Sequence, residues 1–303
     1  MYNELFSYLR EKDVKYKGNV NLSLLSSVKI GGEVKVGIFP NSIEQLVDVL
    51  RFLYSGGYPF CIIGKMTNLL ADDRVYNGVA VFTDKIKGFV VNGNIVRITC
   101  GSMLSGVIMR LSEYSLGGLE MLCGIPGTLG GMIYSNAGAF GRELSDFFVS
   151  ATVYDIKKDK IFTATKDQLY FSYRHSSFKD NKFLAVLDVS LSFEFKDKEI
   201  IKQQIKETQD KRKSTQPIAY PSLGSVFKRC GGVSVARLAD ECGIKGHMIG
   251  GAQISEKHAG FIVNIDNASS EDFRKMISFV KDKIYRCYGL TIEEEIEYFD
   301  FLP

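Results

Sequence analysis

The chain has 303 residues, of which 45% are hydrophobic and 12% aromatic, enough for two domains that each bury a core. Its 38 basic and 35 acidic side chains give a formal net charge of +3, which is too balanced for a surface that binds nucleic acid. The six cysteines show no C-x-x-C spacing, and charges interrupt the apolar residues at the N-terminus. We therefore expect a cytoplasmic protein without a zinc site, a disulfide scaffold or a membrane span.

The N-terminal half alternates strand and helix patterns. A short amphipathic helix opens the chain, and Ser42 with Gln45 predicts the start of a second helix whose apolar residues repeat on one face. Strands on either side of that helix would complete a β-α-β unit. The further elements expected are strands over 34–39, 59–63 and 79–82, a hairpin of 89–91 and 95–99, and a helix over 104–111.

The C-terminal half begins with strands near 149–155 and 183–195, followed by a polar helix over 199–213. Pro217 and Pro221 then indicate a boundary between domains. Beyond it we expect a helix over 235–242, a strand over 260–265 and a helix over 271–288 that begins at Ser269 and ends at Gly289. Because no strict βαβ repetition emerges, the sequence predicts an α+β architecture and not a doubly wound sheet.

Residues 124–141, GIPGTLGGMIYSNAGAFG, form a run rich in glycine. Glycine allows left-handed backbone and close approach of the main chain to a ligand, and exposed N–H groups bind phosphate oxygens. The spacing matches neither the dinucleotide-binding G-x-G-x-x-G nor a P-loop, so tight turns and diphosphate binding both remain open. Residues 64–68, which follow a buried strand, could present N–H groups and the Thr67 hydroxyl to the same diphosphate.

Three single residues have weak independent cases for chemistry. Ser225 follows a turn set by Pro221 and Gly224, where Lys228 or Arg229 could make its hydroxyl a proton donor. Arg174 could bind a carboxylate or enolate through its planar guanidinium, although most arginines are structural. Glu295 would lie between Glu293 and Glu297 on one face of a strand over 291–299, and it would then need a cationic partner or a raised pKa. A solvated edge strand, a turn serine and a surface arginine are the plain alternatives.

The three histidines lack metal-ligand spacing, so we expect no metal.

Taken in order, these segments resemble the UDP-N-acetylenolpyruvoylglucosamine reductase family. The motifs that carry the resemblance are GIPGTLGG with NAGAFG, SYRHS at 172–176, YPSLGSVFK at 220–228 and GGAQISEKHAGFIVN at 250–264. The resemblance implies a two-part FAD-binding region of the vanillyl-alcohol-oxidase type (PCMH-type), with subdomains 1–80 and 81–198, and a C-terminal α+β substrate domain, 199–303. The short link after Arg174 is similar to the type II branch.

The resemblance also implies a reaction: NADPH reduces FAD, and hydride then passes to the enolpyruvyl ether of UDP-N-acetylglucosamine enolpyruvate, giving UDP-N-acetylmuramate for peptidoglycan. Arg174, Ser225 and Glu295 match the active-site positions, with Ser225 as the proton donor. The implied substrate-binding residues are Tyr173, Lys228, Gln253 and His258. The implied cofactor-binding residues are Gly64, Lys65, Met66, Thr67, Asn68, Gly124, Ile125, Pro126, Gly127, Gly130, Gly131, Asn136, Ala137 and Gly138. The partners expected are these small molecules, with no nucleic acid and no membrane, and the chain is expected to be a monomer.

One residue departs from the family pattern. The first phosphate loop of the family usually reads Gly-x-Gly-Ser-Asn, and Met66 stands here in place of its second glycine. We therefore expect the loop to avoid positive φ at Met66 or to shift, with weaker FAD binding as a result. No histidine in this loop offers an attachment point, so FAD should bind noncovalently. A related FAD oxidase or dehydrogenase, or a nucleotide-sugar-binding protein without activity, are the alternative functions.

Overall fold

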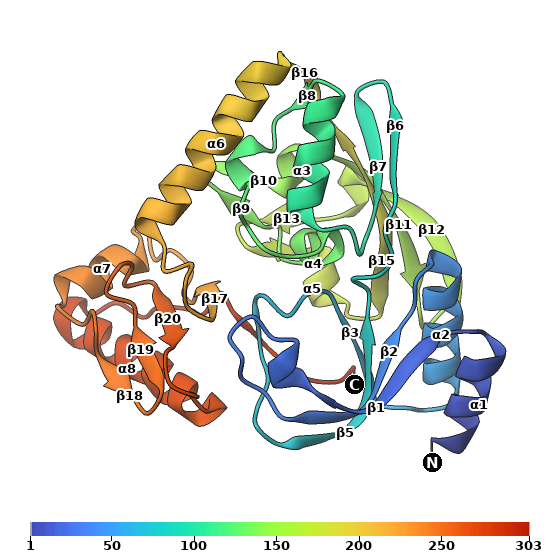
Figure 1. The fold of residues 1–303 in the computed structure, drawn as a ribbon, viewed down its shortest axis with the longest axis horizontal. Coiled ribbons are helices and arrows are strands. Elements are labelled where there is room, and N and C mark those ends of the chain that lie inside the picture. The colour runs from blue at the N-terminus through green and yellow to red at the C-terminus, as the bar shows by residue number, and fades with distance from the viewer. Residues whose placement is uncertain (1, 303) are drawn as a thin grey trace.

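The computed structural model describes residues 2–302, which form three lobes around a common centre (Figure 1). Each lobe contains one of the larger sheets, with strand orders β1-β2-β5-β3, β12-β11-β15-β7-β6 and β17-β20-β19-β18. Helices cover these sheets in an α+β arrangement, as the sequence predicts. Among residues 2–302, no helix is both long enough and apolar enough to cross a membrane.

The first lobe is built on the predicted β-α-β unit. Strands β2 and β3 both run parallel to β5, which lies between them, and helix α2 connects them. The Ser42 hydroxyl accepts a hydrogen bond from the Gln45 N–H at the start of α2, and the apolar face of this helix is buried. Strand β1, which the sequence analysis missed, pairs with β2. The elements of this lobe are α1 (Asn3–Glu11), β1 (Lys15–Asn21), β2 (Glu33–Phe39), α2 (Ile43–Ser55), β3 (Phe60–Ile63), β4 (Leu69–Leu70) and β5 (Val75–Phe82).

The second lobe contains the predicted hairpin and a strand that was not predicted. Strand β12 (Lys160–Thr165) pairs with β11 along its whole length. The glycine run also contains a short helix, α4, in which the Gly130 backbone lies against Cys100 and its N–H donates to the Cys100 carbonyl at 2.8 Å. The larger elements are β6 (Phe89–Asn92), β7 (Ile95–Thr99), α3 (Leu104–Glu113), α4 (Leu129–Tyr134), β11 (Phe148–Asp155), β12 (Lys160–Thr165), α5 (Ser177–Asp180) and β15 (Leu184–Ser192). Short strand pairs join β8 (Leu116–Gly117) to β16 (Glu194–Phe195), β9 (Gly138–Ala139) to β10 (Arg142–Glu143), and β13 (Phe171–Ser172) to β14 (His175–Ser176).

The third lobe packs α7 and α8 against an antiparallel sheet. Helix α8 begins with a capping box between Ser269 and Asp272 and ends at Gly289, whose φ is +68°, so both predicted ends are confirmed. The elements are α6 (Lys198–Thr215), β17 (Ser222–Ser225), α7 (Val235–Glu241), β18 (Met248–Ile249), β19 (Ala252–Ile254), β20 (Phe261–Asn264), α8 (Ser270–Tyr288) and β21 (Glu297–Tyr298).

The boundaries expected from sequence at residues 80 and 198 do not separate the lobes: residue 80 lies within β5, and two segments of the C-terminal region pack on the other lobes. Helix α6 is the bridge from the second lobe to the third (Figure 1), and its Ile201 and Ile205 are buried in the core of the second lobe. At the other end of the chain, β21 returns to pair in parallel with β4 of the first lobe. Packing therefore joins the C-terminal region to the second lobe through α6 and to the first lobe through β21.

Met66 contradicts the expectation that its side chain would keep the first loop out of positive φ. Its φ is +51°, the left-handed conformation that a glycine would adopt. The side chain is only 3% exposed and packs in a core cluster with residues that include Leu22, Tyr76 and Phe299. A left-handed conformation strains a residue with a side chain, and the burial of this side chain offsets that strain. The steric reason for weaker FAD binding is therefore absent.

Replacing Met66 with glycine should destabilise the protein. Loss of the buried side chain outweighs relief of backbone strain, giving a net cost of about 1–3 kcal/mol. We expect a lower thermal unfolding midpoint and no gain in affinity for FAD, measured by quenching of flavin fluorescence. Met66→Ala, which keeps the strain and loses the packing, should be at least as unstable. Tighter FAD binding in Met66→Gly without loss of stability would contradict this account.

Candidate active site

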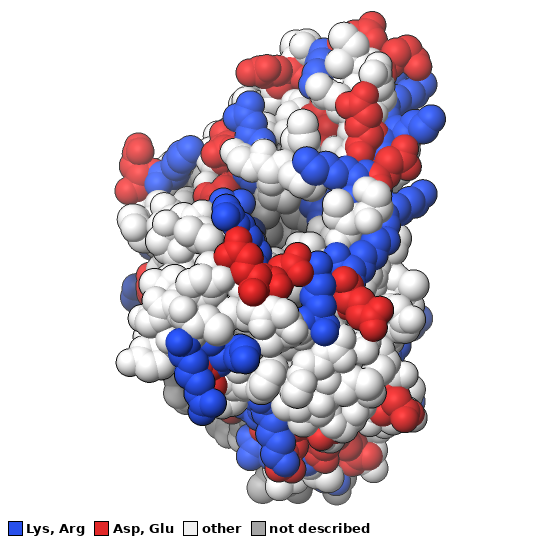
Figure 2. Space-filling view, turned by 90° about the vertical axis from the view of Figure 1, so that its left-hand side faces the viewer, with Lys and Arg blue, Asp and Glu red and all other residues white. Residues whose placement is uncertain are grey.

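The three lobes enclose a cavity of about 850 Å³, and the surface is hollowed on the side that carries α6 and the third lobe (Figure 2). Charged side chains of both signs surround this hollow. The volume lies in the range of pockets that bury a cofactor together with part of a substrate. Both predicted loops, residues 64–68 and the glycine-rich run 124–141, contribute to the cavity wall.

The two loops are joined directly. The Thr67 hydroxyl donates a 2.9 Å hydrogen bond to the Pro126 carbonyl. Gly64 lies against the Thr128 side chain so closely that an added Cβ would be 2.3 Å from Thr128 Oγ1. Gly127, with φ +151°, also lies beside Thr67. The Thr67 hydroxyl is thus used to hold the loops together and is not free to donate to an anion, as the sequence had suggested.

This cavity fits a bound dinucleotide such as FAD. Thr128 Oγ1 and two nitrogens of Arg212 are buried without a hydrogen-bond partner among residues 2–302, and buried polar atoms of this kind call for a ligand. The glycines of both loops leave backbone exposed to the cavity, where N–H groups can bind phosphate oxygens. The predicted cofactor residues that line the cavity are Gly64, Lys65, Met66, Thr67, Asn68, Gly124, Ile125, Pro126, Gly127, Gly130, Gly131, Ala137 and Gly138.

Asn136 is the exception among the predicted cofactor residues. It is fully buried and lies behind the cavity wall. Its amide nitrogen donates to the Glu143 carboxylate at 2.8 Å and to the Ser172 carbonyl at 2.9 Å, and its amide oxygen accepts from the Ser145 N–H. The side chain therefore has no group left for a cofactor, and it connects the loop that carries Arg174 to the end of the glycine run.

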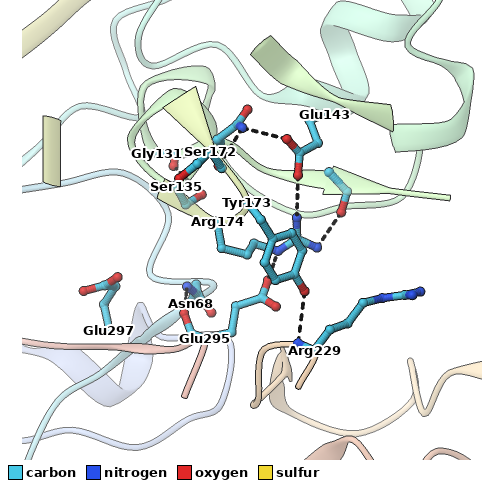
Figure 3. Close-up of polar contacts among 12 residues, drawn as sticks. Asn68, Gly131, Ser135, Glu143, Ser172, Tyr173, Arg174, Arg229, Glu295 and Glu297 are labelled. Atoms are coloured by element: carbon cyan, nitrogen blue, oxygen red, sulfur yellow. Dashed lines mark hydrogen bonds and ion pairs between the residues drawn. The ribbon is translucent and has the colours of Figure 1, made fainter. Parts of the chain in front are cut away.

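Arg174 projects into the cavity from the turn between β13 and β14 (Figure 3). Its backbone is left-handed, with φ +57°, a strained conformation of the kind found at functional sites. The guanidinium donates to Glu295 Oε1 at 2.5 Å and to the Gly138 carbonyl at 2.8 Å, and it lies 3.9 Å from Glu143. These contacts hold the guanidinium in one orientation at the cavity wall.

Glu295 has both properties that the sequence analysis required of it. Arg174 is its cationic partner, and burial raises its pKa although the Arg174 charge opposes that shift. The segment around it is not the solvated strand that alternation suggested, since only residues 297–298 form a strand. Instead, the Glu295 N–H donates to the Val226 carbonyl, and the Asn68 amide donates to the Glu295 carbonyl at 3.0 Å. The flanking glutamates bind other lysines, Glu293 to Lys228 and Glu297 to Lys179.

Ser225 ends β17 and lines the same cavity. The preceding Gly224 has φ +76°, so the predicted turn is present. Among the residues that the structure describes, none forms a hydrogen bond with the Ser225 hydroxyl, which leaves it free for a ligand. Lys228, suggested as a source of positive charge, instead pairs with the exposed Glu293, whereas Arg229 lines the cavity.

The four predicted substrate residues divide into two pairs. Tyr173 and His258 line the cavity, and burial lowers the pKa of His258, which favours a neutral imidazole. Lys228 and Gln253 lie outside the cavity wall. Lys228 is held by its ion pair, and the Gln253 amide donates to the Gly246 carbonyl. A local ion pair and a local hydrogen bond thus account for the positions of Lys228 and Gln253.

The sequence analysis did not single out two residues that the structure places at the cavity, Thr128 and Arg212. Thr128 lay within the glycine run, where its hydroxyl was given no role. Arg212 lay in a helix read as polar throughout. Its spacing from Ile201, Ile205 and Thr208 was the available signal, since residues three or four apart share a helix face.

Comparison with known proteins gives consistent matches. Residues 34–165 match a family model described as "FAD binding domain", and residues 216–299 match the C-terminal domain of UDP-N-acetylenolpyruvoylglucosamine reductase. The reductase of Caldicellulosiruptor bescii is 38% identical over 97% of this chain and 94% of its own length. That of Thermotoga petrophila is 40% identical over 91% of this chain and 96% of its own length.

The reductase of Thermus caldophilus, a solved crystal structure, superposes with a TM-score of 0.80 at 26% identity. The match covers 94% of this chain and 98% of that protein, so all three lobes are included. Both the sequence and the arrangement of the lobes around the cavity place the chain in a single family. The chain belongs to the UDP-N-acetylenolpyruvoylglucosamine reductase family.

Proposed function

We propose that the chain reduces the enolpyruvyl ether of UDP-N-acetylglucosamine enolpyruvate to UDP-N-acetylmuramate, with Arg174, Ser225 and Glu295 as its active-site residues. The observation that carries the proposal is the Arg174–Glu295 pair, which shares one cavity with the unpartnered hydroxyl of Ser225. The family relationship makes the chain an FAD-dependent oxidoreductase of peptidoglycan precursor synthesis, with NADPH as electron donor. When bound, FAD supplies the hydride carrier between NADPH and the substrate.

Arg174 would bind the carboxylate end of the enolpyruvyl group. Reduction at C3 places negative charge on C2 and on the carboxylate, and a guanidinium already oriented by Glu295 and the Gly138 carbonyl can stabilise that charge without rearranging. Such a donor typically contributes about 3 kcal/mol to the stability of a transition state. Glu295 acts in this scheme by holding the guanidinium in place.

Ser225 would donate the proton that C2 requires. A serine hydroxyl is a weak acid, so a nearby cation must stabilise the alkoxide that forms. Arg174 and Arg229 both line the cavity and provide positive charge at its wall. Because the hydroxyl forms no competing hydrogen bond with another described residue, its proton is available for the substrate.

The same chain supplies every residue of the proposed set, which supports a monomer as the working unit. We propose that this monomer acts in the cytoplasm, where nucleotide-sugar precursors and NADPH are available, and that FAD is held noncovalently. Cys123 lies beside the second loop but is buried, as expected for a packed thiol. Acid precipitation should therefore release FAD into the supernatant.

Ser225→Ala should separate the two halves of the reaction. We expect NADPH to bleach the flavin spectrum of this variant at the wild-type rate, because the serine takes no part in that step. Addition of the enolpyruvyl substrate under anaerobic conditions should restore the colour in the wild type but not in the variant. Full recovery in Ser225→Ala would contradict the assignment of the proton donor, and a wild-type protein that takes up no FAD would contradict the function itself.

The pH dependence of kcat/KM should follow the protonation of Glu295. Because its pKa is raised, Glu295 takes up a proton at a higher pH than an exposed glutamate does, and the neutral form no longer balances the Arg174 charge. We expect kcat/KM of the wild type to fall as the pH is lowered through this raised pKa. Glu295→Gln is neutral at every pH, so it should lack that fall and should be at least about tenfold slower at pH 8, on the order of 1.4 kcal/mol.

Glu293→Gln provides the matched control, since this exposed neighbour pairs with Lys228 and not with Arg174. It should keep the wild-type pH profile. An unchanged acid-side fall in Glu295→Gln would show that another group is responsible.

A further inference from the structure

Arg212 is a buried residue in an exposed stretch of α6. Arg212 is only 9% exposed, whereas its neighbours Lys211 and Lys213 face solvent. It lies on the inner face of the helix, in line with Ile201, Ile205 and Thr208. Helix packing does not explain a charged residue at the end of an inner face that otherwise carries two isoleucines and a threonine.

Among the described residues, none supplies a countercharge to the guanidinium. Nε and Nη2 are buried without a hydrogen-bond partner, and Nη1 has only a 3.5 Å contact with the Gln216 side-chain oxygen. Within residues 2–302, no carboxylate forms an ion pair with it. The Phe140 ring, 5.3 Å from Cζ, provides a cation–π contact but accepts no conventional hydrogen bond.

A buried guanidinium without hydrogen-bond partners destabilises the folded protein unless a ligand supplies those partners. Burial lowers the pKa of Arg212, but a guanidinium remains charged at neutral pH, so the charge cannot be removed by loss of a proton. A buried charge without a partner destabilises the folded protein. Two adjacent unpartnered N–H groups, Nε and Nη2, match the oxygens of a phosphate or a carbonyl.

The surroundings of Arg212 indicate where that ligand lies. Its Cδ is so close to Gly124 that a Cβ added there would be 2.8 Å away. Gly124 begins the second cofactor loop and has φ +85°, so it is restricted to glycine by both space and backbone conformation. Arg212, Gly124 and Phe140 all line the cavity, which puts the unpartnered donors at the loop and not on the outer rim.

We propose that Arg212 is a cofactor-binding residue, whose Nε and Nη2 bind an oxygen of FAD. The proposal rests on FAD as the cofactor of the proposed function. It predicts that the unliganded protein carries a destabilising charge that FAD binding relieves. It also couples cofactor binding to α6, the helix that leads into the third lobe, where Ser225 lies (Figure 1).

The test compares apo-protein of the wild type with Arg212→Met, Arg212→Lys and the control Lys211→Met. Lys211 lies over the same Phe140 ring, with Nζ 4.5 Å from its centroid, but on the exposed side. For each protein the thermal unfolding midpoint is measured without and with FAD, and the dissociation constant of FAD is measured by fluorescence quenching.

In Arg212→Met we expect a higher unfolding midpoint of the apo-protein, a smaller increase on adding FAD, and FAD affinity weaker by about tenfold to a hundredfold. Arg212→Lys keeps the charge but loses the planar pair of donors, so its affinity should be intermediate. Lys211→Met should match the wild type in all three measurements.

Wild-type FAD affinity in Arg212→Met would overturn the proposal. Titrations with UDP and NADP⁺ then identify the alternative source: loss of affinity for either one, with FAD binding unchanged, would assign the arginine to the diphosphate of the substrate or of the electron donor. These results are distinct from failure of the proposed function, because a wild-type protein that binds FAD but is not bleached by NADPH would refute the function and leave the Arg212 measurements valid.

Discussion

The return of the C-terminal segment to the first lobe is the constraint on which the site depends. Strand β21 pairs with β4, the Glu297 N–H donates to the Asn68 carbonyl, and the Asn68 amide donates to the Glu295 carbonyl. These contacts bring Glu295 to Arg174, which is 121 residues earlier in the chain. The first loop therefore has two roles, since it lines the cavity on one side and holds the C-terminal segment on the other.

Polar groups at the cavity are held by neighbours from the same lobe and from the C-terminal segment, and a few remain without a partner among the described residues. Arg174 is restrained by Glu295 and Glu143 (Figure 3) and by the Gly138 carbonyl. The Asn136 amide in turn donates a hydrogen bond to the Glu143 carboxylate. In a desolvated site, fixed dipoles and charges act more strongly than in water, so this restraint favours chemistry that develops charge. Thr128 Oγ1, Nε and Nη2 of Arg212 and the Ser225 hydroxyl have no hydrogen-bond partner among residues 2–302, so a ligand in the cavity would complete them.

Met66 illustrates how tertiary packing can support an unfavourable local conformation. Sequence reasoning treated the glycine of the family loop as a backbone requirement, and the backbone of Met66 does meet that requirement with φ +51°. The long, flexible side chain makes this possible by filling space in the core of the first lobe. The loop is thereby anchored to the core that supports it, where a glycine would leave it attached by backbone alone.

The sequence by itself determined the elements with strong local signals. The helix from Ser270 to Tyr288, the β6–β7 hairpin and the β-α-β unit have caps, turn residues and periodicity that act within a few residues. Motifs in order along the chain were also sufficient for the family, and so for its cofactor and reaction. These features can be predicted without knowing which distant segments of the chain are in contact.

Only the tertiary structure decided which polar groups are buried together. The pairing of Arg174 with Glu295, the loss of Asn136 and the Thr67 hydroxyl to structural hydrogen bonds, and the isolation of Arg212 all arise from contacts between segments far apart in the sequence. A side chain's charge and hydrogen-bonding capacity follow from its residue type, but its desolvation and its partners depend on the packing of the three lobes. The sequence therefore determined the candidates for the site, and packing determined which of them face the cavity.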